Sequence, residues 1–316
     1  MKLSLVIPCY NEEANVRPMY EACCAALRDA VSSFEMIFIN DGSTDGTWQQ
    51  LTALYEADEA HVRLIDFSRN FGKEAAMYAG LQRATGDYVT VIDADLQQRP
   101  EVALEMVRFL DANPDYDCVA AYQQQRREGA FTKLCKAVFY KLINIACQTP
   151  IRPDASDFRT FRRPMVDAIL AMKEYHRFSK GIFSFVGFAV HYMPYTAAPR
   201  HAGSTTWSFF KLFRYAREGI ASFTTFPLRI ATLMGSVMSV LSFAYLVVVV
   251  VQKLAFGIEV PGYATIVALI LLIGGLQMIM LGIIGSYVAR IYIQSKDRPL
   301  YIAREYRGGV TEEDDG

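Results

Sequence analysis

The sequence predicts an α/β protein with a mainly parallel sheet, followed by two helices that cross a membrane. Two observations lead to this prediction. Short apolar stretches alternate with helical stretches through the first part of the chain, which is typical of a sheet covered by helices on both faces. Near the C-terminus, two long stretches carry no charged residue, and each is long enough to cross a bilayer.

Four strands are expected, with helices between them. The strands are KLSLVIPCY (2–10), FEMIFINDGS (34–43), HVRLIDFSRN (61–70) and GDYVTVIDAD (86–95), and the helices cover 12–31, 44–58 and 73–86. Each strand is rich in Val, Ile, Leu and Phe, as expected for a strand that is buried on both faces of a parallel sheet.

Polar residues follow every one of these strands. They are Pro8, Tyr10, Asn11 and Glu12 after the first, Asp41, Ser43 and Asp45 after the second, Ser68, Arg69 and Asn70 after the third, and Asp93 and Asp95 after the fourth. Taken alone, each set also suits a turn or a helix cap. Since ligands of such sheets bind beyond the carboxyl ends of the strands, their convergence predicts a binding site at this edge.

The paired carboxylates Asp93 and Asp95 end an apolar strand. Two negative charges one residue apart repel each other unless a cation lies beside them. Carboxylate oxygens are hard ligands that suit Mg²⁺ or Mn²⁺, and Mg²⁺ takes the rest of its coordination shell from water and phosphate. The motif therefore predicts a divalent metal site for a phosphate-bearing ligand.

Two uncharged stretches lie between Arg229 and Lys253 and from Val260 to Ala289, and we interpret them as membrane spans. The alternative is a pair of buried helices in a large soluble core. Basic residues flank the pair, namely Lys211, Arg214, Arg217 and Arg229 before it and Arg290, Lys296 and Arg298 after it. The positive-inside rule then places both flanks, and with them the first domain, in the cytoplasm.

The segment 205–229 separates apolar and basic residues at helical spacing, with Trp207, Phe210 and Ile220 on one face and Arg214 and Arg217 on the other. This pattern predicts an amphipathic helix in the headgroup region. A helix that packs its aromatic face on the first domain is the alternative, and both can hold. The expected organisation is a cytoplasmic domain (1–203), an amphipathic segment (204–228), a membrane hairpin (229–293) and a cytoplasmic tail (294–316).

Composition excludes several other classes of protein. With 52% hydrophobic and 21% charged residues the chain is too apolar for a disordered protein, and a net charge of −1 gives no general field for nucleic acid. The six cysteines form no CxxC pair, and the four histidines have no metal spacing. The glycines of GTW and NFGK do not form a Walker motif.

The succession LSLVIPCYNEE, INDGSTDGT, RNFGKEAAMYAGLQRATGDYVTVIDADLQQRPE, SDFRTFRRPMVDAI, RFSKGIFSFVGF and RHAGSTTW…FPLR resembles the family 2 glycosyltransferases that load a sugar onto a polyprenyl phosphate. Dolichol-phosphate mannose synthases and bactoprenol glucosyltransferases belong to this group, and AGSTTW…FKLF…GIASF is closest to the glucosyl type. The resemblance covers nearly the whole chain. It implies a Rossmann-like GT-A fold, a nucleotide sugar such as UDP-glucose, Mg²⁺ or Mn²⁺, an undecaprenyl phosphate acceptor in the bilayer, and a homo-oligomer, by resemblance a tetramer.

The resemblance also implies roles for individual residues. The nucleotide would be bound by Pro8, Tyr10, Glu12, Asp41 and Asp93, and the metal by Asp95 and Gln97 together with Asp93. Asp157 and Asp95 would be the catalytic carboxylates, and the lipid phosphate would be bound by Arg126, Arg200, Ser204 and Lys211. The chain departs from the family pattern at Gln98 and Arg99, where many members have an acid and a Pro, at Thr206, where they have Lys, and at a Gln upstream of Arg126.

The resemblance implies that Asp157 is the catalytic base, but the charge of the acceptor argues against a simple general base. A phosphate monoester has a second pKa near about 6 and is already ionised at neutral pH. We therefore expect Asp157 to orient the sugar or the acceptor, or to stabilise positive charge at the anomeric carbon. Direct attack by the phosphate predicts inversion, so that an α-linked donor gives a β-linked product.

Three alternatives stay open. The sugar is expected to be glucose, but mannose, N-acetylglucosamine or aminoarabinose on the same lipid also fits. A processive polysaccharide synthase is disfavoured, since the chain has only two predicted spans and no QxxRW motif. A lipid- or nucleotide-binding regulator built on a retired glycosyltransferase domain would retain the fold without turnover.

Overall fold

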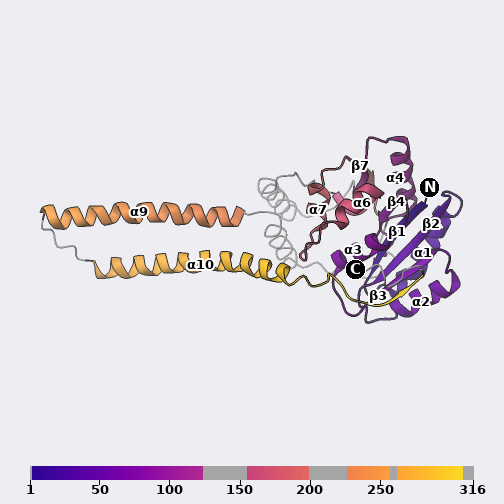
Figure 1. The fold of residues 1–316 in the computed structure, drawn as a ribbon, viewed down its shortest axis with the longest axis horizontal. Helices are drawn as coiled ribbons and strands as arrows, with labels where there is room; N and C mark the ends of the chain where they lie inside the picture. Colours follow the sequence, from indigo (N-terminus) through magenta and orange to yellow (C-terminus); the bar gives the residue numbers. More distant parts are fainter. Residues whose placement is uncertain (1, 124–154, 199–225, 257–261, 309–316) are drawn as a thin grey trace. The chain divides into compact units, whose positions relative to one another are not determined.

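The computed structural model describes residues 2–123, 155–198, 226–256 and 262–308 (Figure 1). The chain divides into two compact units. One contains residues 1–216 together with 299–316, and the other contains residues 217–298. The first unit therefore takes in chain from both sides of the second.

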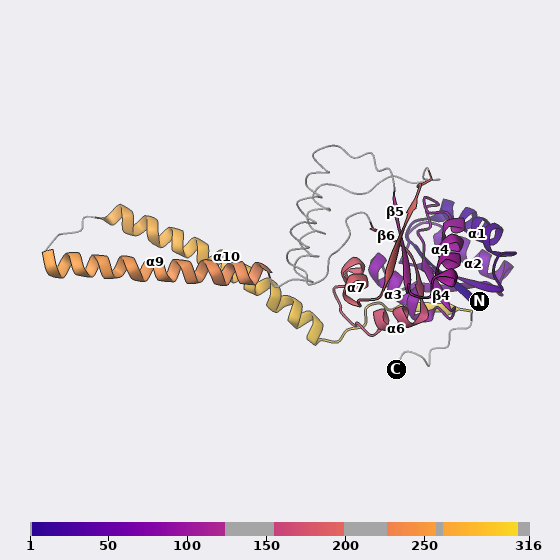
Figure 2. The ribbon, with the colours of Figure 1, turned by 90° about the horizontal axis from the view of Figure 1, so that it is seen from above.

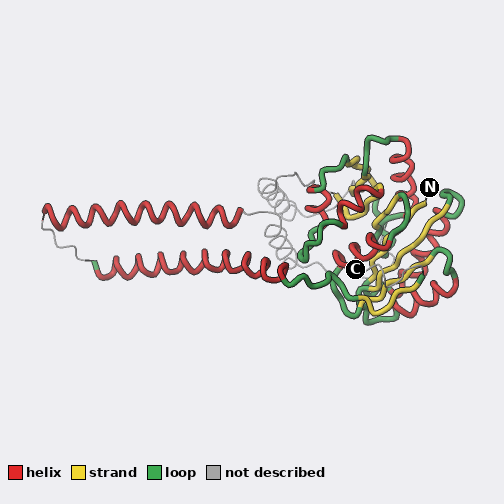
Figure 3. The backbone as a smooth tube through the Cα atoms, viewed as in Figure 1, coloured by secondary structure: helices red, strands yellow, loops and turns green. Residues whose placement is uncertain are grey.

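The first unit is built on an eight-stranded sheet with the order β7-β5-β6-β4-β1-β2-β3-β8. Figure 3 shows the strands in yellow with helices around them. The strands are β1 (Lys2–Cys9), β2 (Ser33–Asn40), β3 (Val62–Phe67), β4 (Tyr88–Val91), β5 (Cys118–Gln123), β6 (Ala155–Arg162), β7 (Val190–Tyr195) and β8 (Ala303–Arg307). The four strands expected from the sequence are β1 to β4, and all four are confirmed.

Helices cover the central strands on both faces. They are α1 (Glu13–Leu27), α2 (Thr47–Ala57), α3 (Lys73–Arg83), α4 (Pro100–Ala112), α6 (Arg163–Leu170) and α7 (Ser179–Phe185). Apolar side chains of α1, α2 and α4 pack with Leu5 and Ile7 of β1 in one buried cluster. On the other face α3 packs very close to the sheet. Gly80 allows this approach, since a Cβ at this position would lie 2.3 Å from Cγ1 of Val6.

The central strands β3, β2, β1 and β4 are mutually parallel. The strand order reverses direction at β1, which lies between β2 and β4, and such a switch point opens a crevice at the carboxyl ends of the two diverging strands. The last residues of β1 and β4, Cys9 and Val91, mark this end of the sheet.

β6 runs antiparallel to β4, and its register decides which residues meet at the crevice. Val91 pairs with Arg159. Continuing this register by two residues places Asp157 beside Asp93. Two carboxylates far apart in sequence are thus brought to one place by the pairing of two strands.

The sheet ends at β8, which pairs antiparallel with β3. Tyr301, just before β8, fixes the position of this strand. Its ring stacks on Phe67 with 4.8 Å between centroids, and its hydroxyl donates to Gln82 at 3.0 Å. The sequence analysis did not predict this strand.

The second unit contains the helices α9 (Phe226–Phe256) and α10 (Tyr263–Ser295), which contact each other as a hairpin (Figures 1 and 2). Residues 230–252 and 272–295 are long and apolar enough to cross a membrane, and 0% of each apolar window is buried within the chain. The apolar side chains thus lack the cover that a core helix of a soluble protein has, which agrees with the two predicted spans.

Candidate active site

Asp41 lies directly after β2 at the edge of the crevice and is 4% exposed. The backbone N–H of Phe71 donates to its Oδ1 at 2.7 Å, and that of Gly72 donates to its Oδ2 at 3.0 Å. Burial raises the pKa of Asp41 to about 6, although these two bonds and the charge of Arg69 oppose the shift. Its carboxylate is therefore preorganised, and it titrates close to neutral pH.

The loops after β1 and β2 are joined by hydrogen bonds. The backbone N–H of Asn11 donates to Oγ of Ser43 at 3.0 Å, and the side-chain oxygen of Asn11 accepts from the N–H of Thr44 at 2.8 Å. Asn11 has a φ of 56°, a left-handed conformation that Asn tolerates well. These contacts fix the backbone directly after Tyr10.

Three further residues of the predicted nucleotide site lie in β1 or shortly after it. Pro8 belongs to the strand, and Tyr10 directly after it is 48% exposed. The backbone N–H of Glu12 donates to Oγ1 of Thr47 at 2.9 Å, and its carboxylate accepts from Asn15 at 2.5 Å. An exposed aromatic ring next to a fixed carboxylate is suited to stacking and hydrogen bonding with a nucleoside.

The acidic motif follows β4 without any intervening helix. Oδ1 of Asp95 accepts the backbone N–H of Gln97 at 3.1 Å, so the chain turns tightly after the strand. Leu96 within this turn has a φ of 62°. The turn keeps Asp93, Asp95 and Gln97 together at the carboxyl end of the strand.

Gln98 holds Asp93 by two hydrogen bonds. Its Oε1 accepts the backbone N–H of Asp93 at 2.9 Å, and its Nε2 donates to Oδ2 of Asp93 at 3.1 Å. Gln98 is 5% exposed. The departure from the family pattern at this position thus supplies both a donor and an acceptor to the acidic motif.

Lys73 joins Asp93 to Asp157. Its Nζ lies 2.6 Å from Oδ1 of Asp93 and 3.5 Å from Oδ2 of Asp157. Burial raises the pKa of Asp157, but the charges of Lys73, Lys180 and Arg159 outweigh burial and hold that pKa below its usual value. Asp157 is therefore an ionised carboxylate throughout the neutral range.

The donor set fits a divalent metal that also binds phosphate. Asp93 and Asp95 offer carboxylates and Gln97 offers an amide oxygen, all of them hard ligands. Among the described residues no group of three or more His, Cys, Asp or Glu side chains is arranged to hold a metal ion. A metal here would take part of its shell from phosphate and water, as Mg²⁺ commonly does.

The residues predicted to bind the lipid phosphate, Arg126, Arg200, Ser204 and Lys211, lie outside the described residues, as does Thr206. Their predicted roles stay predictions. The predicted amphipathic segment lies for the most part outside the described residues as well.

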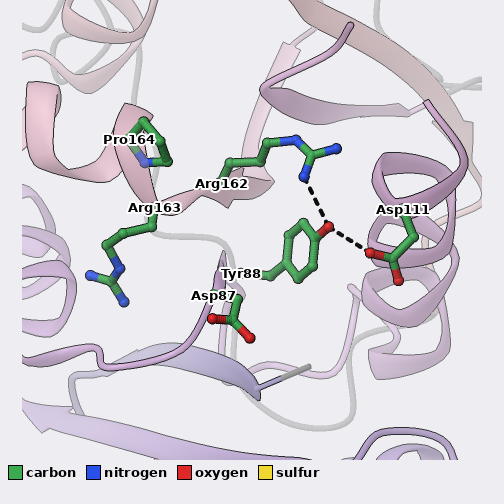
Figure 4. Close-up of a pocket in the computed structure, with 6 residues that line it drawn as sticks. All are labelled: Asp87, Tyr88, Asp111, Arg162, Arg163 and Pro164. Carbon is green, nitrogen blue, oxygen red and sulfur yellow. Dashed lines mark hydrogen bonds between the residues drawn. The ribbon is translucent and has the colours of Figure 1, made fainter. Parts of the chain in front are cut away.

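A cavity of about 440 Å³ lies at the other end of β4, away from the acidic motif (Figure 4). The hydroxyl of Tyr88 donates to Asp111 at 2.6 Å, and Arg162 donates to that hydroxyl at 3.0 Å. Arg163 donates to the carbonyl of Gly86. These polar groups satisfy one another, and they tie the start of β4 to α4 and β6.

Sequence reasoning missed two contacts that organise the site. Lys73 was visible in NFGK, but the only pattern tested there was the Walker motif. Glu74 lies beside it, and its carboxylate accepts both the backbone N–H and the hydroxyl of Ser179 at the start of α7. A signal was available, since Lys73 and Glu74 come shortly after the polar end of the third strand, on the side of the sheet where ligands bind.

Two family models match parts of this chain. The family model "Glycosyl transferase family 2" matches residues 4–170, and the model "GtrB C-terminal hairpin" matches residues 226–291. Two solved structures of glucosyl-3-phosphoglycerate synthase from Mycobacterium tuberculosis are also similar. Each is 21% identical over 70% of this chain, with a TM-score of 0.46. The matched region covers 78% of the first of the two chains and 77% of the second.

Three curated relatives are similar over nearly the full length. An uncharacterized glycosyltransferase from Synechocystis is 39% identical, covering 98% of this chain and 96% of its own. A prophage bactoprenol glucosyl transferase homolog from Escherichia coli is 39% identical over 97% of this chain and 100% of its own. The bactoprenol glucosyl transferase of Shigella phage SfV is 39% identical, covering 96% and 98%. With the family model matched across the strands and helices that carry the acidic motif, the chain belongs to glycosyltransferase family 2.

Proposed function

We propose that this protein transfers glucose from UDP-glucose to a polyprenyl phosphate, undecaprenyl phosphate in a bacterial cell, with inversion at the anomeric carbon. One observation carries the proposal. Asp93 and Asp157 meet at the switch point of a family 2 fold whose relatives, named bactoprenol glucosyl transferases, are 39% identical over nearly the whole chain. The apolar hairpin would give such an enzyme access to a lipid acceptor.

In this proposal the nucleotide lies against Pro8, Tyr10, Glu12 and Asp41. The fixed carboxylate of Asp41 accepts an N–H of the base, and the exposed ring of Tyr10 stacks on it. This assignment is supported by the two backbone N–H groups that orient Asp41 and by the hydrogen bonds that fix the neighbouring loops.

Asp93, Asp95 and Gln97 would hold Mg²⁺ or Mn²⁺ together with the diphosphate of the donor. When bound, the metal supplies a Lewis acid for the negative charge that develops on the departing nucleoside diphosphate. The hard oxygen donors and their tight turn after β4 support this assignment.

The chemical step is a displacement. A phosphate oxygen of the acceptor forms a bond to C1 of the sugar, while the bond from C1 to the β-phosphate oxygen breaks and UDP leaves with the electron pair. No proton has to be removed from an ionised phosphate. Asp157, held ionised by neighbouring cations, orients the sugar or the acceptor and stabilises positive charge at C1.

The lipid phosphate would be bound by Arg126, Arg200, Ser204 and Lys211, since cationic side chains suit a phosphate. The predicted boundaries, 1–203 for the catalytic part, 204–228 for the amphipathic part, 229–293 for the hairpin and 294–316 for the tail, belong to this proposal. So does the tetramer, which crosslinking in native membranes would test.

The proposed orientation places the catalytic unit and both termini in the cytoplasm, at the inner membrane. Two spans return the chain to the side from which it started. β8 follows the second span and pairs with β3, so the flanks of the hairpin belong to one folded unit, which supports a common side. The basic flanks support the cytoplasmic side.

The test is transfer of label from a panel of radiolabelled nucleotide sugars to undecaprenyl phosphate, comparing wild type with Asp95→Asn. Transfer from UDP-glucose that is abolished by EDTA and by the substitution is expected. Transfer from another donor would correct the sugar. Binding of nucleotide without transfer from any donor, in folded protein, would favour the non-enzymatic regulator.

A further inference from the structure

Lys73 is the first residue of α3, and it lies where three elements meet. Its Nζ contacts Asp93 after β4 at 2.6 Å and Asp157 of β6 at 3.5 Å. The sequence prediction assigned no role to this lysine. Its position between the acidic motif and the predicted catalytic carboxylate makes it the cation that these two groups share.

The placement of Lys73 depends on the nucleotide end of the site. It follows Phe71 and Gly72, whose backbone N–H groups both bind Asp41. Gly72 has a φ of 96°, a conformation that residues with a Cβ rarely adopt. Asp41 and this glycine thus fix the point at which α3 begins, and with it the root of the lysine side chain.

The bridge is partly open to solvent. The side chain of Lys73 is 43% exposed, and those of Asp93 and Asp157 are 32% and 24% exposed. Ion pairs that are reached by water contribute little to stability and are readily exchanged. Lys73 therefore compensates the two carboxylates without being locked to them.

Two cations would compete for Asp93, namely Lys73 and the divalent metal of the proposed function. In this structure its Oδ1 is bound by Lys73 and its Oδ2 by Gln98. The proposed function requires the same carboxylate to face a divalent metal. Because a divalent cation attracts a carboxylate more strongly than an ammonium does, the metal would take Oδ1 from Lys73.

We propose that Lys73 is a positioning residue that bridges Asp93 and Asp157 before the donor binds and competes with the divalent metal for Asp93. With a metal bound, Lys73 would pair with Asp157 alone and hold that carboxylate in place for the reaction. The inference rests on the proposed function for its metal and its turnover.

The first experiment measures Mn²⁺ binding to the full-length protein in detergent, without nucleotide, by electron paramagnetic resonance. Lys73→Met removes the competing ammonium at nearly constant volume. We expect a dissociation constant about two- to fivefold lower than that of wild type, the range given by an exposed ion pair. Lys73→Arg keeps the charge and should stay within about twofold of wild type.

Lys180→Met is the matched control. Lys180 also lowers the pKa of Asp157, so this substitution removes the same charge from the same site. A general field effect would tighten Mn²⁺ binding equally in Lys73→Met and Lys180→Met, and that result overturns the bridge. Unchanged or weaker binding in Lys73→Met, in protein that unfolds at the wild-type temperature, overturns it as well.

A second measurement needs no variant. The rate at which Lys73 of the wild-type protein is acetylated, followed by mass spectrometry, should rise severalfold on addition of Mn²⁺, because the amine then pairs with one carboxylate instead of two. An unchanged rate at saturating Mn²⁺ overturns the competition.

Turnover separates this inference from the proposed function. If wild type transfers sugar, Lys73→Met should lower kcat about tenfold or more while tightening Mn²⁺, a combination that simple loss of structure does not give. If wild type transfers no sugar, the proposed function fails, but the Mn²⁺ titration and the acetylation rate still decide whether Lys73 competes with the metal.

Discussion

The side-chain amide of Gln98 binds Asp93 at two points, accepting from its backbone N–H at 2.9 Å and donating to its carboxylate at 3.1 Å. An amide can do both, whereas an ionised acid at this position could accept but has no proton to donate. The orientation of the acidic motif therefore depends on a residue outside the motif.

Gln98→Glu tests this dependence with a side chain of the same shape. It places a carboxylate against that of Asp93, and we expect a loss of about 1–3 kcal/mol in the free energy of unfolding at pH 8. The loss should shrink toward pH 5, because protonation of the introduced carboxyl restores a donor. Thermal unfolding in detergent at several pH values measures it. Gln49→Glu, an exposed substitution on α2, is the control, and a pH-independent deficit in Gln98→Glu would contradict the explanation.

Asp41 predicts a pH dependence of donor binding. With a pKa of about 6, roughly nine tenths of its carboxyls are protonated at pH 5 and few at pH 7. The ionised form is the better acceptor for an N–H of the base, so the dissociation constant for UDP-glucose should fall about tenfold from pH 5 to pH 7. Calorimetry measures this change. Asp41→Asn should bind weakly at every pH, and a slope that persists in this variant would assign the titration to another group.

Loss of Asp157 should affect turnover equally at every pH, in contrast to the pH-dependent binding predicted for Asp41. Its pKa is held below its usual value, so between pH 5 and 8 its charge does not change. Asp157→Asn should lower kcat about 100-fold at every pH, the size expected for loss of one stabilising charge. The pH profile of wild type should keep its shape in the variant. Disappearance of an acid limb, with activity recovered above it, would identify Asp157 as a general base.

Glu74 predicts an effect on α7. Its carboxylate accepts the backbone N–H of Ser179 at 3.0 Å and also the Ser179 hydroxyl. Glu74→Ala leaves both donors without this acceptor, and we expect a loss of about 1–3 kcal/mol in the free energy of unfolding. Ser179→Ala removes the hydroxyl alone and should cost less, and Glu74→Gln, which keeps an oxygen acceptor, should lie between them. Chemical denaturation of the three variants measures the order, and equal losses would show that the cap is not responsible.

The sequence was sufficient to predict β1 to β4 and the two apolar helices. A buried parallel strand is a short apolar run between polar ends, and a span is an apolar run of sufficient length, so both are local properties. The polar strand ends were predictable for the same reason. The order of parallel strands then brings those ends to one edge, which general rules of α/β folds supply.

The pairs of residues that make up the site were not predictable in this way. The proximity of Asp93 and Asp157 follows from the register of β4 on β6, and no local pattern encodes a register between distant strands. The sequence alone does not distinguish Lys73 from the other lysines, because its place in the site depends on where α3 begins. β8 is five residues long and polar, and only its partner β3 makes it a strand.

β8 also orders events during synthesis. The edge of the catalytic sheet is finished by residues that the ribosome makes after the apolar hairpin, so β3 lacks its neighbour while the hairpin is being made. An unpaired strand edge is prone to wrong partners. The catalytic unit can reach its final form only once the hairpin is complete, which links maturation of the enzyme to completion of its apolar anchor.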